Sequence, residues 1–314
     1  MIVVATKFSH KIGYGHIFRC LNIIEKFGKN NCLLIVNQKD KILEYLDRVN
    51  FKVIDYRKKN WEDKILNKYQ IKIWINDRLK TTKKHFNKLN KNSIFSVSID
   101  DEGSSHKFYD LNISQNININ NNNNNNTKII NDKSLLILKK VKKNNIFIRK
   151  KLRNIMITFG GSDTYSMTNK VLKTLSETKF NINIYYGPGY KNKIKKFNNK
   201  NFKYITNIKN LENEMVKFDL LICGGGVTPL NAASQGLPSL IIACENHEIK
   251  TAQYLKKLRI SNYLGFRKIS INETYLNKLN LNLMSKNCLK FFSNSGSINF
   301  VNFIKKKYYA QTRS

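Results

Sequence analysis

The chain has 314 residues, 41% of them hydrophobic, and a formal net charge of +35 from 56 basic and 21 acidic side chains. This length suits two domains of ordinary size, each with its own core. No run approaches the ~18 apolar residues that a membrane-spanning helix needs, so we expect no transmembrane segment.

The basic residues are spread along the whole chain, with no single arm and no repeated aromatic-basic motif. A strongly basic balance is typical of proteins that bind nucleic acid or anionic membranes. Because Lys, Asn and Ile dominate every segment, we interpret the charge as compositional bias. We expect no specific nucleic-acid partner, and a peripheral membrane contact stays open. The charge would still favour an anionic small molecule such as a nucleotide.

Five cysteines occur, and none of them forms a CxxC pair. Most fall in apolar runs, where a buried reduced thiol is the default, so a reducing compartment is indicated. The first apolar run, residues 2–5, is far too short for a signal peptide. We therefore expect a cytoplasmic protein, and we expect it to be a monomer.

Short apolar runs alternate with helical segments through the first half. Strands are predicted over residues 2–5, 32–36, 51–54, 71–75 and 94–99, and helices over 17–27, 41–49, 61–69 and 82–89. This βαβ alternation predicts a parallel sheet with helices on both faces. An unbroken asparagine run over 120–126 cannot bury enough apolar surface to offset its ordering entropy. We interpret residues 115–131 as a flexible insertion.

The second half repeats the alternation. Strands are predicted over 155–159, 182–186, 204–205, 220–223 and 240–243, and helices over 167–175, 211–218, 230–235, 249–258 and 298–309. The expected fold class is α/β, with two Rossmann-like domains over residues 1–145 and 146–314. Ligands of open α/β sheets bind outside the carboxyl ends of the strands. If the two domains face each other, the loops at those ends would line a cleft.

Gly13, Gly15 and His16 follow the first predicted strand and precede a helix. Two glycines one residue apart let the backbone turn tightly and approach a ligand without a Cβ atom in the way. His16 places a group that titrates near neutral pH at a helix N-terminus, beside the carboxyl end of a strand. Because position 18 is Phe, the third glycine of a GxGxxG fingerprint is missing, and a dinucleotide site is set aside. We predict that His16 carries the chemistry, against the alternative of a structural histidine.

The best candidate anion site is the segment Gly224-Gly225-Gly226-Val227-Thr228-Pro229. Its glycines expose backbone N–H groups, Thr228 suits a helix N-cap, and Pro229 suits the first helical position. A glycine loop at a helix N-terminus binds phosphate through oriented donors and the helix dipole. The alternative is an ordinary strand-to-helix turn.

Two further loops follow predicted strands. Gly160-Gly161-Ser162-Asp163 could contact phosphate or sugar hydroxyls, or could cap the next helix. Asn246-His247-Glu248 supplies groups that suit sugar hydroxyls, unless it is a capping loop. Gly187-Pro188-Gly189 is more typical of a turn.

Carboxylates also end two strands of the first half, at Asp77 and at Asp100-Asp101-Glu102. Such groups could bind a metal, cap turns or orient His16. No HExxH motif or Cys/His pairing occurs, so we predict no metal and no cofactor. There is no GxSxG elbow to support serine hydrolysis. His85 lies in a basic helix and is expected to face solvent.

Taken in chain order, these motifs resemble those of one family. The motifs are the Gly15-His16 loop with Arg19, Asn76-Asp77-Arg78, Asp100-Asp101-Glu102-Gly103, Gly160-Gly161-Ser162-Asp163, Gly187-Pro188-Gly189, and the stretch from Gly224 through Pro238 to Glu248. The family is the UDP-sugar hydrolase of pseudaminic acid biosynthesis, with its spore-coat-polysaccharide relatives. It is similar to the GT-B glycosyltransferase that makes lipid II. The resemblance covers nearly the whole chain.

The resemblance implies a GT-B-like pair of Rossmann-type domains, with UDP held mainly by the C-terminal one. It implies hydrolysis of UDP-2,4-diacetamido-2,4,6-trideoxy-β-L-altropyranose to UDP and the free sugar, with His16 as general base on the attacking water. Asn246 matches an amide next to the sugar, and Gly224 to Thr228 would hold the pyrophosphate. The acid that often binds the nucleotide ribose falls at Asn231, whose amide can still hydrogen-bond hydroxyls.

The residues implied in substrate binding share positions in these loops. They are Gly13, Gly15, Arg19, Asp77, Gly160, Gly161, Ser162, Gly224, Gly225, Gly226, Thr228, Asn231, Asn246, His247 and Glu248. Departures from the family pattern at Lys7 and Leu79 leave the sugar open.

Two alternatives to the hydrolase remain. The first is a GT-B glycosyltransferase that passes a sugar from a UDP donor to an acceptor hydroxyl in surface polysaccharide synthesis. The second is a nucleic-acid-binding protein explained by the charge. This last hypothesis predicts salt-sensitive polyanion binding that does not depend on His16.

Overall fold

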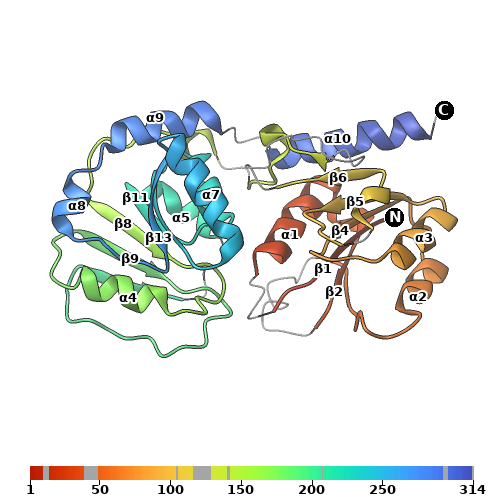
Figure 1. Ribbon diagram of the computed structural model, residues 1–314, viewed down its shortest axis with the longest axis horizontal. Helices are drawn as coiled ribbons and strands as arrows, with labels where there is room; N and C mark the ends of the chain where they lie inside the picture. Colours follow the sequence, from red (N-terminus) through yellow and green to blue (C-terminus); the bar gives the residue numbers. More distant parts are fainter. Residues whose placement is uncertain are drawn as a thin grey trace. The chain divides into compact units, whose positions relative to one another are not determined.

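The computed structural model describes residues 1–9, 14–38, 49–103, 105–115, 129–139, 142–206, 208, 210–292 and 296–312. The chain divides into two compact units. The first comprises Met1–Ile12, His16–Ile137 and Ser295–Ser314, and the second comprises Gly13–Gly15 and Leu138–Asn294. Each unit contains one parallel β-sheet with helices around it (Figure 1). The predicted α/β fold with two Rossmann-type units is confirmed.

The first unit, where it is described, has a seven-stranded sheet in the order β3-β2-β1-β4-β5-β6-β7. The strands are β1 (Ile2–Thr6), β2 (Cys32–Val36), β3 (Phe51–Val53), β4 (Ile73–Asp77), β5 (Phe95–Ile99), β6 (Leu111–Ile113) and β7 (Ile129–Ile130). The strand order reverses between β1 and β4, which is the switch point where α/β sheets bind ligands. Thr6 pairs with Asp77, so the carboxyl ends of β1 and β4 lie side by side.

Strands β2, β4 and β5 are buried at every residue, which explains why they read as short, nearly continuous apolar runs. The helices are α1 (Gly15–Phe27), α2 (Trp61–Lys68) and α3 (Lys83–Lys91). In α1 the apolar side chains recur every three or four residues, and Ile17, Cys20, Ile24 and Phe27 are buried. This stripe fixes which face of α1 lies against the core and therefore where its first turn points.

The second unit, in its described part, has a six-stranded parallel sheet in the order β10-β9-β8-β11-β12-β13. Its strands are β8 (Asn154–Thr158), β9 (Asn181–Tyr185), β10 (Phe202–Ile205), β11 (Leu220–Cys223), β12 (Ser239–Ala243) and β13 (Ser261–Phe266). Its helices are α4 (Met167–Thr174), α5 (Leu211–Glu214), α6 (Thr228–Ala233), α7 (Asn246–Lys257), α8 (Glu273–Asn277) and α9 (Leu281–Phe291). Thr158 pairs with Cys223, so the switch point between β8 and β11 is flanked by two glycine loops.

The C-terminal helix α10 (Gly296–Gln311) belongs to the first unit, although the sequence assigned residues 146–314 to the second domain. The Tyr308 ring packs edge-on against Phe95 at 5.8 Å, and Gln311 Nε2 donates to Asp110 Oδ1 at 3.1 Å. These contacts join residues about two hundred positions apart. A local sequence pattern therefore could not show which unit this helix packs against. The expected boundary at 145/146 is corrected, because the second unit runs from Leu138 to Asn294 and α10 belongs to the first.

Other elements differ from the sequence-based expectations. β6, β7 and β13, and the helices α8 and α9, were not predicted. Most of the predicted insertion over 115–131 lies outside the described residues, but Ile129 and Ile130 form β7 and pair with β6. The helix expected over 41–49 also lies outside them, apart from its last residue.

The chain also forms short 3-10 helices, which are η1 (Lys29–Asn31), η3 (His106–Phe108), η4 (Lys133–Leu135), η5 (Lys143–Asn145) and η6 (Met215–Lys217).

No helix in the described part of the chain is long and apolar enough to cross a bilayer.

Candidate active site

His16 and Asp77 form a hydrogen-bonded pair at the switch point of the first sheet. His16 lies in the first turn of α1, and Asp77 is the last residue of β4. His16 Nδ1 lies 2.7 Å from Asp77 Oδ1. A carboxylate only accepts, so Nδ1 donates its proton to Asp77, and in the neutral ring Nε2 keeps its lone pair. This is the arrangement in which an imidazole can act as a general base through Nε2.

The environment of Asp77 keeps it ionised. Its side chain is fully buried, which by itself disfavours the charged form. The positive charge of Arg19 and the hydrogen bonds that Arg19 and His16 donate outweigh this burial, and they hold the pKa of Asp77 well below its usual range. The carboxylate therefore remains an acceptor for His16 across the physiological pH range.

Arg19 is buried and donates hydrogen bonds to two carboxylates, those of Asp77 and Asp100. Its Nε donates to Asp77 Oδ2 at 2.7 Å, one terminal nitrogen also donates to Asp77 Oδ1, and the other donates to Asp100 Oδ2 at 2.8 Å. Asp100 in turn accepts from the Gln115 backbone at 2.7 Å. Arg19 and Asp77 were predicted to bind substrate. The structure instead places them behind His16, because every charged atom of Arg19 faces a carboxylate.

The surface of His16 remains accessible. Its side chain is 19% exposed, whereas the side chain of Asp77 is fully buried. A Cβ atom added at Gly15 would meet nothing within 4 Å, so no atom of the described residues requires a glycine there. The open space beside Gly15 is consistent with the predicted close approach of a ligand. Gly13, the other predicted glycine, lies outside the described residues.

The acidic residues after β5 are structural. Asp101 Oδ1 accepts from the backbone of Thr81 at 3.1 Å and of Gly103 at 2.7 Å. Asp100 has a positive φ of 50° and holds Arg19. No group of three or more His, Cys, Asp and Glu side chains in the described part of the chain could hold a metal ion.

In the second unit the loop from Gly224 to Val227 joins β11 to α6. Among the described residues, no hydrogen-bond acceptor faces the backbone N–H groups of Gly225, Gly226 and Val227. These donors have no partner among the described residues, and the anion site predicted at this loop stays a prediction. The N-cap of α6 is Val227, with no side-chain cap, and Thr228 is the first helical residue. The prediction of Thr228 as N-cap is therefore wrong by one position, and α6, with six residues, has only a small dipole.

Glu248 lies directly against this loop. A Cβ atom added at Gly225 would come within 2.8 Å of the Cβ atom and of the backbone carbonyl oxygen of Glu248. A residue with a side chain therefore does not fit at position 225 without a shift of Glu248. Glu248 Oε2 accepts from the Cys244 backbone at 2.7 Å and from the Glu245 backbone at 3.4 Å. Glu245 and Glu248 thereby form a capping box at the start of α7. Glu248, predicted to bind sugar, supports the glycine loop instead.

The side-chain amide of Asn231 also has hydrogen-bond partners within the protein. Its Oδ1 accepts from the Lys139 backbone at 3.2 Å, and its Nδ2 donates to Glu212 Oε1 at 3.1 Å. The side chain is buried, so both halves of the amide are used within the second unit. No local sequence pattern indicates this pairing, because Glu212 is nineteen positions away, in α5.

The loop after β8 combines open and buried groups. Gly160 is exposed with a φ of +73°, and Ser162 is buried with its Oγ 3.3 Å from Thr164 Oγ1. Asp163 accepts from the backbone of Met167 and Thr168 at 2.7 and 3.0 Å, so it caps α4. The capping alternative is confirmed for Asp163. A ligand contact at the exposed Gly160 stays a prediction.

The turn over 187–189 packs under this loop. A Cβ atom added at Gly187 would lie 2.4 Å from Gly160 O and from Gly161 Cα. The turn that the sequence predicted is therefore part of the support for Gly160 and Gly161.

Asn246 and His247 begin α7 and are exposed. Since Glu245 and Glu248 satisfy the helix start, the side chains of Asn246 and His247 are not needed for capping. They remain candidates for contact with a sugar.

His85, expected to face solvent, is buried at 3% exposure. Its Nδ1 lies 2.7 Å from Glu62 Oε1, and its Nε2 lies 2.9 Å from Asn76 Nδ2. Asn76 Oδ1 accepts from Arg78 Nε at 2.9 Å and from Trp74 Nε1 at 3.2 Å, so the amide orientation is fixed. Nε2 must then accept, which requires a neutral ring. Burial first, and the charge of Arg78 next, lower the pKa of His85 to about 4.

No protein-family model matches the chain. An uncharacterized protein of Methanocaldococcus jannaschii is 27% identical over 305 residues, which cover 88% of this chain. The chain spans 60% of the length of that relative.

Solved glycosyltransferase structures match the chain over nearly its full length. MurG of Acinetobacter baumannii matches with a TM-score of 0.61 and 12% identity, over 97% of this chain and 99% of that one. The glycotransferase of kitacinnamycin matches with a TM-score of 0.65 and 7% identity, over 98% of both chains. The spinosyn rhamnosyltransferase SpnG, solved with thymidine diphosphate, matches with a TM-score of 0.57 and 10% identity, over 99% and 96%. At these identities the likeness is one of fold, and the fold is GT-B.

Proposed function

We propose that this chain is an enzyme that transfers the sugar of a nucleoside-diphosphate sugar to an acceptor hydroxyl. The observation that carries the proposal is the pair of His16 and Asp77, which stands at the switch point of the first sheet with Nε2 available. The fold shared with glycosyltransferases supports the same class of substrate.

In this mechanism His16 Nε2 accepts the proton of the attacking hydroxyl as its oxygen bonds to the anomeric carbon. The bond between that carbon and the diphosphate oxygen breaks, and the electron pair leaves with the nucleoside diphosphate. The Asp77 carboxylate stabilises the imidazolium that forms and holds the ring in one orientation. Arg19 and Asp100 keep Asp77 in place. The proton then passes from Nε2 to solvent.

The diphosphate is assigned to the loop from Gly224 to Val227. Its free backbone N–H groups would bind phosphate oxygens and stabilise the charge that grows on the leaving group. We assign sugar contacts to Gly160, Asn246 and His247, which together with Gly15 are the exposed members of the predicted set among the described residues. Uridine as the nucleoside rests on the sequence resemblance alone.

Water in place of the acceptor hydroxyl would make the enzyme a hydrolase. This second candidate is favoured by the ordered set of motifs that resembles the UDP-sugar hydrolase of pseudaminic acid biosynthesis. In both reactions the protein atom that accepts the proton is His16 Nε2. The diacetamido-trideoxy sugar and a role in nonulosonic acid synthesis belong to this candidate, and surface polysaccharide synthesis belongs to the first.

The test is to incubate the protein with a panel of UDP-linked sugars, including diacetamido-trideoxy sugars, and to measure UDP release with and without acceptor alcohols. Release that requires an acceptor supports the transferase. Release in water alone supports the hydrolase. If no nucleotide sugar in the panel is cleaved and UDP does not bind, the proposal of a UDP-sugar enzyme is wrong.

A further inference from the structure

A cavity of about 570 Å³ lies at the amino-terminal edge of the first sheet, away from the candidate active site. Ile2 at the start of β1 and Ile73 at the start of β4 line it, whereas Asp77 ends β4. Four residue steps along a strand of ~3.3 Å each separate the two sites by about 13 Å. The cavity is therefore independent of His16 and Asp77.

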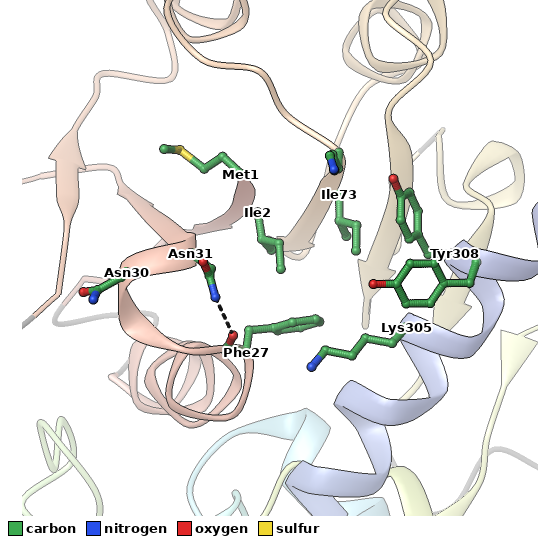
Figure 2. Close-up of a pocket in the computed structure, with 10 residues that line it drawn as sticks. Met1, Ile2, Phe27, Asn30, Asn31, Ile73, Lys305 and Tyr308 are labelled. Atoms are coloured by element: carbon green, nitrogen blue, oxygen red, sulfur yellow. Dashed lines mark hydrogen bonds between the residues drawn. The ribbon is translucent and has the colours of Figure 1, made fainter. Parts of the chain in front are cut away.

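Three elements form the walls of the cavity. Phe27 ends α1, Asn30 and Asn31 follow it in η1, and Lys305, Tyr308 and Tyr309 project from α10 (Figure 2). Asn31 Nδ2 donates to the Phe27 carbonyl at 3.3 Å, which ties η1 to the end of α1. The size falls within the range of small-molecule pockets, ~300–1,000 Å³.

The charge of the lining has one sign. The side chains that line the cavity include Lys72 and Lys305 and no acidic residue. Lys305 is half-buried, and its ammonium lies 5.5 Å from the centre of the Phe27 ring. Neither lysine forms an ion pair with any residue that the structure describes. A half-buried ammonium held over an aromatic ring, without a carboxylate partner, favours an anion beside it.

The remaining lining is aromatic and apolar. The Phe27 ring is buried at 6% exposure, and the Tyr308 ring packs edge-on against Phe95 and at a tilt against Tyr309. Tyr309 is 55% exposed and Met1 38% exposed at the mouth. Aromatic walls prefer an aromatic ligand, because ring pairs gain energy from edge-to-face or offset stacking.

We propose that this cavity binds a small aromatic organic anion, with its anionic group at Lys305 and Lys72 and its ring between Phe27 and Tyr308. The ring fills the apolar interior, and the anion replaces the carboxylate that the two lysines lack. The high net charge of the protein attracts anions to the whole surface, and this cavity adds an aromatic lining to two lysines.

The probe is 2-naphthoate, and its neutral counterpart is 2-naphthalenemethanol. Binding is measured by isothermal titration calorimetry at about 0.15 M salt. We expect 2-naphthoate to bind at least tenfold more tightly than the alcohol. Lys305→Gln should weaken 2-naphthoate about tenfold, and Lys72→Gln about threefold because Lys72 is exposed. Lys306→Gln is the matched control, since Lys306 is the exposed neighbour on α10 and does not line the cavity.

Melting temperatures of the variants show whether each is folded. The proposal is overturned if 2-naphthoate binds no more tightly than the alcohol, or if Lys306→Gln weakens it as much as Lys305→Gln in folded proteins. Displacement of 2-naphthoate by UDP would place the anion at the glycine loop and would also overturn it. If 2-naphthoate remains bound in saturating UDP, the two sites are distinct.

Discussion

His16 Nδ1 and Asp77 Oδ1 lie 2.7 Å apart, so the imidazole has one proton position fixed and one nitrogen free. The two residues are sixty-one positions apart in the chain. They meet because parallel strands on either side of a switch point end at the same edge of the sheet.

Asp77→Asn should lower kcat about 100-fold or more, because an amide neither fixes the Nδ1 proton nor stabilises the imidazolium. UDP affinity should stay within about twofold, since Asp77 belongs to the first unit and the glycine loop to the second. Turnover and calorimetric UDP binding measure the two effects. Glu25→Gln on the exposed side of α1 is the control. An unchanged kcat in a folded Asp77→Asn protein would remove Asp77 from the mechanism.

Gly225 and Gly226 should respond differently to alanine. At Gly225 the added Cβ would lie 2.8 Å from Glu248 backbone and side-chain atoms, whereas at Gly226 the nearest atom is 3.5 Å away. Gly225→Ala should therefore cost about 1–3 kcal/mol of unfolding free energy, and Gly226→Ala should be close to neutral. Urea denaturation of both variants measures this. Equal losses would show that Glu248 does not confine the loop.

Glu248→Gln should tighten UDP binding about fivefold. Its carboxylate oxygen lies close to Gly224 and Gly226, where it opposes a phosphate bound to the same loop. The amide oxygen of glutamine can still accept from the Cys244 backbone, so the loop should keep its position. Calorimetry at two salt concentrations should show the gain shrinking at higher salt. Weaker UDP binding by a folded variant would mean that the carboxylate supports the loop more than it repels the nucleotide.

His85 should make the protein sensitive to acid. Its folded pKa is about 4 against 6.5 for a free histidine, so the unfolded chain binds the proton more tightly. Stability is therefore fully present above pH 6.5 and is lost as pH falls through this window toward 4. The loss is on the order of 3 kcal/mol. In His85→Gln the urea midpoint of unfolding should depend much less on pH over this range. His247→Gln, a variant of an exposed histidine, should show the same pH dependence as the wild-type protein. If His85→Gln kept the pH dependence of the wild-type protein, a group other than His85 would cause the loss of stability in acid.

Much of the fold could be predicted from the sequence because strands buried on both faces read as short apolar runs between amphipathic helices. The glycine loops were also visible, since their spacing after the strands marks close approaches of backbone. What failed depended on non-local packing. Arg19 follows His16 by one helical turn, but its partners Asp77 and Asp100 come from other strands. No local pattern showed that α10 returns to the first unit.

Three side chains show the limit of residue type as a guide. His85 was placed in solvent because lysines surround it, yet it lies four residues before the buried Leu89, and this helical spacing indicated a buried face. Asn231 and Glu248 carry groups that suit sugars, but their partners within the second unit already use those groups.

The most direct test of the proposed function is UDP release by His16→Ala with the nucleotide sugar that the wild-type protein cleaves best. The proposal predicts that kcat falls at least about 100-fold while calorimetric UDP affinity stays within about twofold. Release at the wild-type rate by the folded variant would contradict the proposal, because no base at His16 would then be needed.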